Sequence, residues 1–417
     1  MPARCADPAA ARDFALAVVG GLRRAGHEAY WAGGCVRDEL LGRTPADYDV
    51  ATAARPEQVR DIFGRRRTLA VGAAFGVITV LGPRAAGQVE VATFRADAPS
   101  TDGRHPDGVT FCSAREDARR RDFTINGLFL DPLTGAVHDF VGGRDDLAAG
   151  IVRAIGMPAQ RFAEDHLRML RAIRFTAFFG FVLDTATREA IERAPHLVAT
   201  VSPERVAAEL RAMMERPGRG QALELLEATG LAREILADVV PRPADRPRWR
   251  ESARIVAALD EPDLPLALAA LGEDAPAAIS RLATRLRLSN HEGRTAAWLI
   301  EALRTLGSAD ATSLQSWPRS RLQPWLAHDA TPALADLLRA RATVGRGDPA
   351  AAAWFTAEAG RPQAERDPPP LLTGADLLAA GIPAGPALGD ALARARMLQL
   401  DGAVTTKAEA LTAILGG

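Results

Sequence analysis

The stretch that decides the fold is WAGGCVRDELLGRTPADYDV, residues 31–50. It combines a glycine pair, Gly33 and Gly34, with two nearby aspartates. A glycine pair at a strand-to-helix turn lets backbone N–H groups approach a phosphate, and the positive end of the helix dipole strengthens that attraction. The apolar pattern predicts a strand over 27–32 before the pair and a short helix over 36–41 after it.

The two aspartates, Asp47 and Asp49, follow that predicted helix. The alternation over 47–52 predicts a strand, and residues two apart on a strand point to the same side. The two carboxylates would repel each other unless a cation lay between them, and Mg²⁺ that also binds triphosphate oxygens would supply it. An Asp-x-Asp pattern taken alone is typical of a solvated strand edge, but the preceding glycine turn favours a metal site.

A third acidic residue, Glu90, is flanked by valines in a predicted strand over 88–94. If that strand lies beside Asp47 and Asp49, Glu90 completes a carboxylate triad. The alternative is a glutamate on the outward face of an alternating strand. We predict Glu90 as a catalytic residue together with the two aspartates.

A further cluster joins residues 119–127 to residues 164–175. The periodicity predicts one continuous helix over 160–179, on which Asp165 and Arg168 would share a face. A carboxylate beside a forked donor can match the Watson–Crick edge of a base. The alternative is a surface ion pair worth less than ~1 kcal/mol. Spacing alone does not separate the two interpretations.

The chain has 417 residues, which predicts two to four domains. Strand and helix patterns mix over about the first 150 residues. Beyond about residue 158 the strand signals vanish and helical spacing continues to the end, with a proline- and arginine-rich loop expected over 241–249 and a linker over 360–370. We predict an α/β head followed by helical parts, with boundaries at 1–155, 156–220, 221–360 and 361–417.

The formal net charge is −1, so any contact with RNA must use local basic groups rather than a general excess of charge. Lys407 is the only lysine, and an arginine therefore counts only when its context supports it. Cys5, Cys35 and Cys112 form neither a disulfide framework nor a zinc pattern, which favours the cytoplasm. No apolar run approaches the ~18 residues of a membrane span, and no secretory signal is expected.

Together these stretches resemble the class II tRNA nucleotidyltransferase and bacterial poly(A) polymerase family. Residues 33–49 look like its first motif, RRDFTIN at 120–126 like its second, and residues 139–147 like its third. Residues 164–175 resemble its nucleotide-selecting helix. Matches at 202–210 and in the tail, from residue 372 onward, keep the same order.

The resemblance implies an α+β protein: a polymerase-beta-like head with a mixed sheet, followed by an all-α neck, body and tRNA-binding tail. Asp47 and Asp49 would be the Mg²⁺ ligands that activate an RNA 3′-hydroxyl for attack on the α-phosphate. Arg121 and Asp122 would sense the ribose, and the glycine turn with Arg37 would hold the triphosphate. The nucleotide-binding residues implied by the resemblance are Gly33, Gly34, Arg37, Arg121, Asp122, Asp165, Arg168, Arg171 and Arg174.

Members of this family add CCA, CC, A or poly(A). A loop over 95–109, which includes Asp102-Gly-Arg-His-Pro, argues against CC addition alone, and residues 65–78 lack the form expected of poly(A) polymerases. Full CCA addition is favoured, with tRNA, CTP and ATP as partners and no protein partner implied; addition of A alone comes next and poly(A) synthesis third.

Two other classes of protein are possible alternatives: an RNA-binding protein with a degenerate head and a small-molecule nucleotidyltransferase. The intact aspartate pair disfavours the first, and the long helical part disfavours the second.

Overall fold

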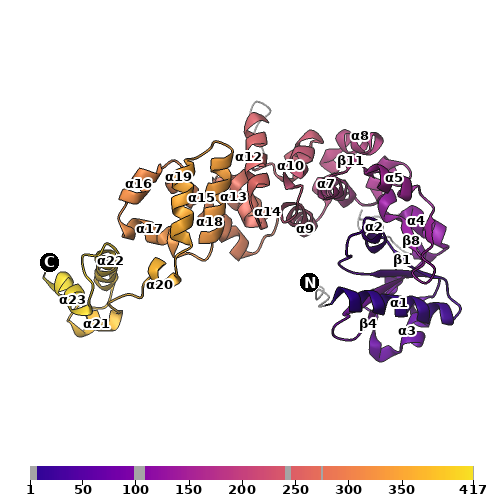
Figure 1. The fold of residues 1–417 in the computed structure, drawn as a ribbon, viewed down its shortest axis with the longest axis horizontal. Coiled ribbons are helices and arrows are strands. Elements are labelled where there is room, and N and C mark those ends of the chain that lie inside the picture. Colours follow the sequence, from indigo (N-terminus) through magenta and orange to yellow (C-terminus); the bar gives the residue numbers. More distant parts are fainter. Residues whose placement is uncertain (1–6, 98–108, 240–245, 274–275, 417) are drawn as a thin grey trace. The chain divides into compact units, whose positions relative to one another are not determined.

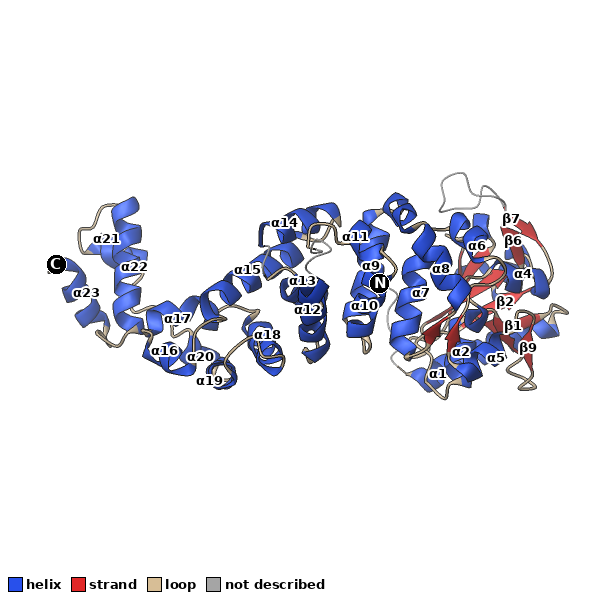
Figure 2. Ribbon diagram, turned by 90° about the horizontal axis from the view of Figure 1, so that it is seen from above, coloured by secondary structure: helices blue, strands red, loops and turns tan. Residues whose placement is uncertain are grey.

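The structure is a computed structural model that describes residues 7–97, 109–239, 246–273 and 276–416 (Figure 1). Cys5 and the predicted stretch 102–106 lie outside the described residues. The chain divides into two compact units, Met1–Ala237 and Asp238–Gly417. Every strand among the described residues belongs to the first unit, and the second is built of helices (Figure 2). The α+β class is therefore confirmed.

The head contains a mixed seven-stranded sheet with the order β3-β4-β5-β2-β1-β8-β9. Neighbouring strands are antiparallel except for β2 and β5, which run parallel. The strands of this sheet are β1 (Ala29–Ala32), β2 (Asp49–Thr52), β3 (Thr68–Leu69), β4 (Val77–Leu81), β5 (Gln88–Thr93), β8 (Leu128–Leu130) and β9 (Val137–Asp139). Two further pairs are β6 (Arg95–Asp97) with β7 (Val109–Phe111) and β10 (Ile151–Val152) with β11 (Val182–Leu183).

Several helices of the first unit begin or end at capping residues. Asp7 accepts hydrogen bonds from two N–H groups of the first turn of α1, and Ser113 with Glu116 forms a capping box at α4. Gly180, in the left-handed region, ends α7. These helices are α1 (Pro8–Arg24), α2 (Gly34–Leu40), α3 (Pro56–Phe63), α4 (Ala114–Arg120), α5 (Gly143–Ala149), α6 (Pro158–Glu164), α7 (Leu167–Phe179), α8 (Thr185–Arg193), α9 (Pro203–Met214), α10 (Arg219–Ala228) and α11 (Leu231–Ile235), with short 3₁₀ turns at Arg65–Arg67, Ala73–Phe75, Thr124–Asn126 and Pro195–Thr200.

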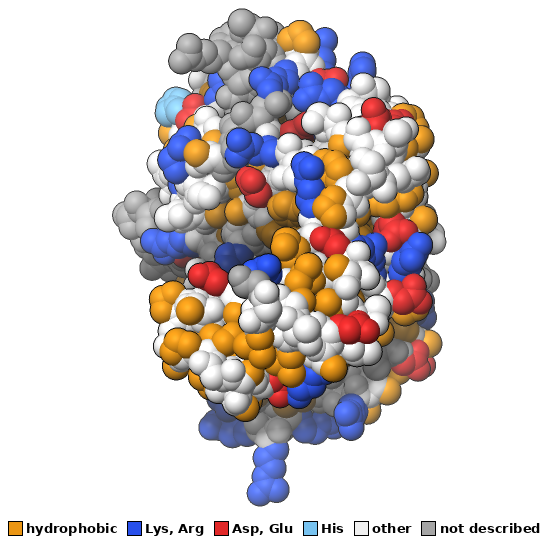
Figure 3. Space-filling model, turned by 90° about the vertical axis from the view of Figure 1, so that its left-hand side faces the viewer, with side chains coloured by type: hydrophobic (Ala, Val, Ile, Leu, Met, Phe, Trp, Pro, Cys, Tyr) orange, Lys and Arg blue, Asp and Glu red, His pale blue; other side chains and the backbone are white. Residues whose placement is uncertain are grey.

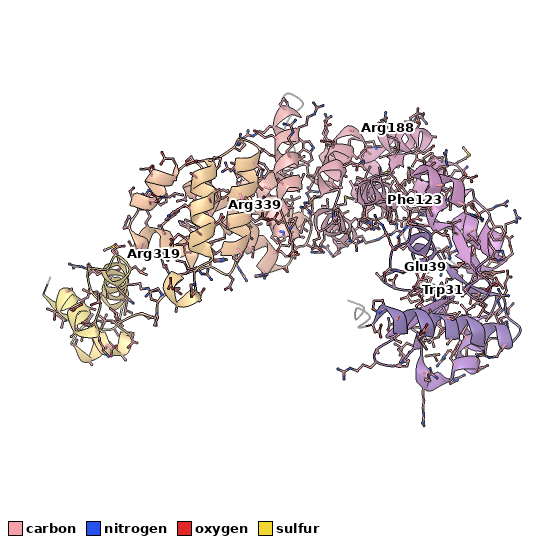
Figure 4. The ribbon with its side chains drawn as sticks, in the orientation of Figure 1. Trp31, Glu39, Phe123, Arg188, Arg319 and Arg339 are labelled. Atoms are coloured by element: carbon pink, nitrogen blue, oxygen red, sulfur yellow. The ribbon has the colours of Figure 1, made fainter. Side chains whose placement is uncertain are left out.

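Side chains alternate between the two faces of the sheet and so divide the core. Tyr30 and Ala51 pair across β1 and β2 and share one buried cluster with Phe129 and with Ala118 of α4. Trp31, labelled in Figure 4, points to the other face, where the Arg12 guanidinium of α1 lies 5.2 Å from its ring centre. Because Asp49 and Glu90 are in step with Ala51 and Ala92, their side chains point to the face of the sheet that packs against α4.

The second unit consists of twelve helices within its described residues. Arginine side chains tie them together: Arg319 forms an ion pair with Glu358 at 2.7 Å, and Arg339 donates a hydrogen bond to the carbonyl of Ala258 at 2.8 Å (Figure 4). The helices are α12 (Arg246–Ala258), α13 (Leu264–Leu271), α14 (Pro276–Arg285), α15 (Asn290–Leu306), α16 (Ala311–Ser316), α17 (Arg319–Leu326), α18 (Thr331–Thr343), α19 (Pro349–Ala359), α20 (Gln363–Arg366), α21 (Gly374–Ala379), α22 (Pro386–Leu400) and α23 (Lys407–Leu415).

Several local predictions were wrong. The loop expected over 241–249 is helical from Arg246 onward, and the linker expected over 360–370 contains the short helix α20. A strand, β11, occurs beyond residue 158, where none was expected, because it pairs with β10 from the end of the head. In each case a contact with another segment, or the start of a helix, determined the local structure, and the preference predicted from the local composition did not.

Charge is mixed on the surface. On the face drawn in Figure 3, basic and acidic side chains are interspersed among the described residues, and hydrophobic side chains gather in the lower half of the view. This distribution agrees with the net charge of −1. Within the part of the chain that the structure describes, no helix has the length and apolar character needed to span a bilayer.

Candidate active site

The glycine turn joins β1 to α2 as the sequence predicts. Gly33 adopts φ 77° and ψ −128°, a conformation that L side chains rarely adopt, and its N–H donates to the carbonyl of Leu128 at 3.2 Å. A Cβ at this position would stand 3.0 Å from Nη1 of Arg121. Glycine is therefore required here twice, for its backbone angle and for the arginine packed against it.

The three predicted carboxylates lie in the same part of the head, near the start of β2. Asp49 begins β2 and is the direct partner of Glu90 on the parallel strand β5, so the two side chains emerge side by side. Asp47 lies ahead of the strand rather than on it, because β2 begins at Asp49. The strand predicted over 47–52 is thus shorter, and the two-residue period does not by itself place Asp47.

The three carboxylates are nonetheless close enough for their charges to interact. The pKa of Asp49 is raised to about 7, first because the surrounding protein removes solvation from the carboxylate and then because Asp47 and Glu90 are negatively charged. Arg121 opposes this rise. The side chain of Asp49 is nevertheless exposed to solvent, so a cation can reach its carboxylate. A carboxylate in such a place can take up a cation and lose its proton in the process.

Arg121 is held beside the turn by a carboxylate that the sequence argument missed. Asp117, 1% exposed, accepts hydrogen bonds from Nε and Nη2 of Arg121 at 3.2 and 3.0 Å and from Nε of Arg120 at 2.8 Å. It also accepts the backbone N–H of Arg95, the first residue of β6, at 3.3 Å. Burial alone would raise the pKa of Asp117, but Arg121 and Arg120 hold it below its usual range.

Arg37 is buried on α2, with 7% of its surface exposed. Its guanidinium donates to Oδ1 of Asn126 at 2.6 Å and to Oδ1 of Asp38 at 2.9 Å. The same group lies over the rings of Phe175 and Phe179 of α7, 5.2 and 4.6 Å from their centres. Arg37 therefore already has polar and aromatic partners, and it links the glycine turn to α7.

A polar chain continues from Asn126 into the helices. Asp122 accepts from Nδ2 of Asn126 at 3.0 Å and from Nε of Arg171 at 2.8 Å. Burial alone would raise the pKa of Asp122, but Arg171 and these hydrogen bonds lower it to about 2. On α9, Glu209 accepts from Nε of Arg174 at 2.6 Å and lies 3.9 Å from Arg171. These groups connect the head to α7 and α9 through charges that are largely removed from water.

The continuous helix predicted over 160–179 is wrong. It is interrupted at Asp165 and His166, between α6 and α7, and Asp165 has extended backbone angles. Oδ1 of Asp165 accepts the N–H of Leu167 at 3.1 Å, which satisfies an otherwise unpaired donor at the start of α7. An aspartate side chain readily accepts hydrogen bonds from nearby backbone N–H groups and so competes with the hydrogen bonds of a continuous helix. This competition explains why the helix is interrupted at Asp165.

Asp165 and Arg168 do not pair with each other. Oδ2 of Asp165 accepts from Nη2 of Arg205 on α9 at 2.7 Å, while Nη1 of Arg168 donates to Oε2 of Glu164 at 2.5 Å. The alternative of an ion pair between the two residues is therefore excluded in this structure. Both side chains are positioned by other partners, and Arg168 also contacts the backbone carbonyl of Arg120 at 3.4 Å.

Four partners of the predicted residues were missed by sequence reasoning. Some had a visible signal: Asp117 stands three and four residues before Arg120 and Arg121 on one helix, the spacing of a side-chain pair. The others have partners 35 to 89 residues away, and no local pattern predicts such contacts. The missed residues are Asp117, Asn126, Arg205 and Glu209.

The three predicted carboxylates meet some of the requirements for binding a hard cation and not others. Asp47, Asp49 and Glu90 offer oxygen ligands of the kind that Mg²⁺ prefers. Among the described residues, however, no group of three or more His, Cys, Asp or Glu side chains is already gathered closely enough to hold a metal ion. Two aspartates that share an ion with triphosphate oxygens agree with both observations.

Comparisons with known proteins agree with this geometry. Residues 29–153 match the family model "Poly A polymerase head domain", and residues 180–241 match "Probable RNA and SrmB- binding site of polymerase A". The CCA-adding enzyme of Anoxybacillus flavithermus is 43% identical over 218 residues, which is 52% of this chain and 54% of that protein. The Bacillus subtilis CCA-adding enzyme is 42% identical over 222 residues, 53% of this chain and 55% of that protein. The chain thus matches about half the length of these relatives.

Solved structures resemble the chain over nearly its whole length. The Bacillus stearothermophilus CCA-adding enzyme in complex with CTP has a TM-score of 0.77 at 29% identity and covers 96% of each chain. The Thermotoga maritima CCA-adding enzyme complexed with tRNA has a TM-score of 0.68 at 19% identity, covers 97% of this chain and 94% of its own, and shows the fold alone. The matched head, the helical match that follows it and the shared fold agree with the sequence motifs, and the chain is similar to the class II tRNA nucleotidyltransferase and bacterial poly(A) polymerase family in its head, in the following helical segment and in its fold.

Proposed function

We propose that this protein adds C, C and A to the 3′ end of tRNA, using CTP and ATP and releasing pyrophosphate. The observation that carries the proposal is that Asp49 lies directly beside Glu90 on the neighbouring strand and within range of the charge of Asp47, next to a glycine turn. The likeness to CCA-adding enzymes, one of them solved with CTP, supports the same reaction.

In this reaction the RNA 3′-oxygen forms a bond to the α-phosphorus, and the bond from that phosphorus to the bridging oxygen of pyrophosphate breaks. We propose that Asp47 and Asp49 hold Mg²⁺, which when bound would stabilise charge on the attacking and leaving oxygens. Glu90 is proposed as the third carboxylate, adjacent to Asp49 on β5. The rest of the chemistry is positioning of the two substrates by protein groups.

The nucleotide is proposed to lie between the glycine turn and α7. The turn at Gly33 and Gly34 would receive the triphosphate, with the N–H of Gly34 as donor because that of Gly33 already donates to Leu128. Arg121 and Asp122 would face the ribose. Arg37, Arg171 and Arg174 support the site from within, because their guanidinium groups already have partners. They would act by holding α7 in a fixed position relative to the glycine turn.

Asp165 and Arg168 are proposed to read the base. A carboxylate accepts and a guanidinium donates, so the pair offers a pattern that cytosine and adenine can match. Selection by protein side chains would explain how C and A are added without a nucleic-acid template. The body and tail, predicted at 221–360 and 361–417, would hold the remainder of the tRNA, and the cytoplasm stays a prediction from cysteine usage.

The experiment that tests the function supplies purified protein with tRNAs ending before CCA, after C and after CC, each with CTP or ATP alone and with both. We expect growth by C, C and one A, followed by a stop. Extension only of the tRNA ending in CC would instead identify an A-adding enzyme. A long ladder of A residues would identify a poly(A) polymerase, and no extension of any RNA would overturn the proposal.

A further inference from the structure

Arginine and phenylalanine side chains alternate from α2 to the turn after α9. Arg37 lies 4.6 Å from the ring centre of Phe179, and Arg43 lies 5.1 Å from that same ring. Arg43 also lies 5.2 Å from the ring centre of Phe178, and Arg216 lies 5.0 Å from it. We call these five residues the arginine–phenylalanine ladder. It combines segments that are far apart in sequence, all within the first unit.

The members of the ladder differ in how their charge is balanced. Arg37 is buried and pairs with Asp38. Arg43 and Arg216 are exposed, and neither side chain has an acidic partner among the described residues. Their guanidinium carbons are within roughly 10 Å of each other, because each lies about 5 Å from the same ring centre. Two like charges this close, without a counter-charge, favour the binding of an anion.

The backbone fixes both arginines. The N–H of Arg43 donates to the carbonyl of Asp38 at 2.8 Å, which ties it to the end of α2. Arg216 belongs to a turn whose Gly218 has φ 84°, and a Cβ on that glycine would stand 2.0 Å from the carbonyl oxygen of Ala177. The turn therefore rests directly on the last turn of α7. Each ring supports a guanidinium face and leaves its N–H edge free to donate.

We propose that Arg43 and Arg216 form a binding site for backbone phosphates of the RNA substrate. The chemistry fits: exposed guanidinium edges donate bidentately to phosphate oxygens, and aromatic side chains interleaved with basic ones are typical of single-strand binding surfaces. The inference rests on the proposed function, since it assumes that the polymer substrate is RNA.

The position favours the RNA backbone over the nucleotide triphosphate. The triphosphate is expected at the start of α2, at Gly33 and Gly34, whereas Arg43 follows the other end of that helix. Seven residues separate those ends, about 10 Å at 1.5 Å per residue. An RNA substrate must extend beyond the reacting nucleotide, and Arg43 and Arg216 would place positive charge beside its backbone there.

The test compares Arg43→Ala, Arg216→Ala and the double variant with Arg84→Ala, which removes an exposed arginine from the turn between β4 and β5. Affinity for a tRNA lacking CCA is measured by fluorescence anisotropy over a series of salt concentrations, and CTP affinity is measured without RNA. We expect each ladder variant to bind RNA about three- to tenfold more weakly at low salt. We also expect the slope of log K against log salt to fall by about 0.7 to 0.9 per lost phosphate contact. CTP affinity and the Arg84→Ala variant should match the wild type.

Arg43→Lys keeps the charge and should keep the salt slope. Unchanged RNA affinity and slope in the double variant would overturn the site, as would a loss of CTP affinity with RNA binding intact. A loss of thermal stability alone would show that the arginines only complement the negative end of α7. If the wild type itself binds no RNA, the proposed function fails as well, so the two failures are distinguishable.

Discussion

Asp165 accepts a 2.7 Å hydrogen bond from Arg205, 40 residues further along the chain and on another helix. The carboxylate also accepts the N–H of Leu167 and so lies at the start of α7. Both oxygens therefore have partners before any nucleotide binds. The side chain proposed to read a base is held in place by α9, whereas Arg168 is held by Glu164.

If the Asp165–Arg205 pair positions the reading group, Arg205→Ala should lower the preference for the correct nucleotide, as Asp165→Ala should. We expect each variant to reduce the ratio of correct to incorrect incorporation by about ten- to a hundredfold, the equivalent of one hydrogen bond to a charged group. Affinity for tRNA should change far less. Arg211→Ala, on the same helix and paired loosely with Glu215 at 3.9 Å, is the control. Retained selectivity in Asp165→Ala would remove the base-reading role.

Asp47→Ala and Asp49→Ala should each reduce incorporation on the order of a thousandfold or more, because loss of a metal ligand removes several kcal/mol of transition-state stabilisation. Binding of tRNA should stay within about threefold of the wild type. Single-turnover assays and RNA binding by anisotropy would measure the two effects. Glu90→Gln tests the third carboxylate, and full activity in that variant would confine the metal site to the aspartates.

Metal binding should release protons near neutral pH. The pKa of Asp49 is raised to about 7, so roughly half of this group is protonated at pH 7, and an incoming cation would displace that proton. Calorimetry of Mg²⁺ binding with CTP present, in buffers of different ionisation enthalpy, would count the protons. We expect about 0.5 at pH 7 and fewer at pH 8. Release that does not vary with pH would show that Asp49 is not the group.

Asp117→Asn should impair catalysis through Arg121. The substitution leaves two arginines without their shared charge, so Arg121 would lose its fixed place beside Gly33. We expect kcat/KM for CTP to fall about tenfold or more, with the same fall in Arg121→Gln and no further loss in the double variant. Asp131→Asn is the matched control, since it breaks another buried pair, with Arg23 at 3.0 Å. Additive losses would show that Asp117 acts elsewhere.

The acid stability of the first unit should depend on Asp122. Its pKa is about 2 in the folded protein, below the ordinary value of 3.8, so its ionised form stabilises the fold. That contribution is complete above the unfolded pKa and is lost as pH falls from about 4 through 2. It amounts to about 2 kcal/mol. Urea unfolding of Asp122→Asn should show a lower stability at pH 7 and a smaller decline toward acid than the wild type. Equal declines would contradict the assignment.

The glycine turn and the aspartate pair could be read from the sequence, because both depend on neighbours within a few residues. A strand followed by Gly33 and a helix has one favourable geometry, and glycine is the residue that reaches it at φ 77°. The pairing of Asp49 with Glu90 was expected only if two strands were adjacent, and the sheet order supplied that adjacency.

The α+β organisation, the order of the motifs and the residues that could carry the chemistry follow from the amino-acid pattern alone. How those residues are held becomes visible only in the folded chain, where Asp165 pairs with Arg205, Arg37 with Asn126, and Arg121 with Asp117. The helix predicted over 160–179 is interrupted at Asp165, whose side chain accepts the N–H of Leu167 and so replaces a helical backbone hydrogen bond. The apolar periodicity of the sequence does not show this interruption. Local patterns record backbone preference and amphipathic spacing, whereas a buried charge takes its partner from whichever segment the fold brings within hydrogen-bonding distance.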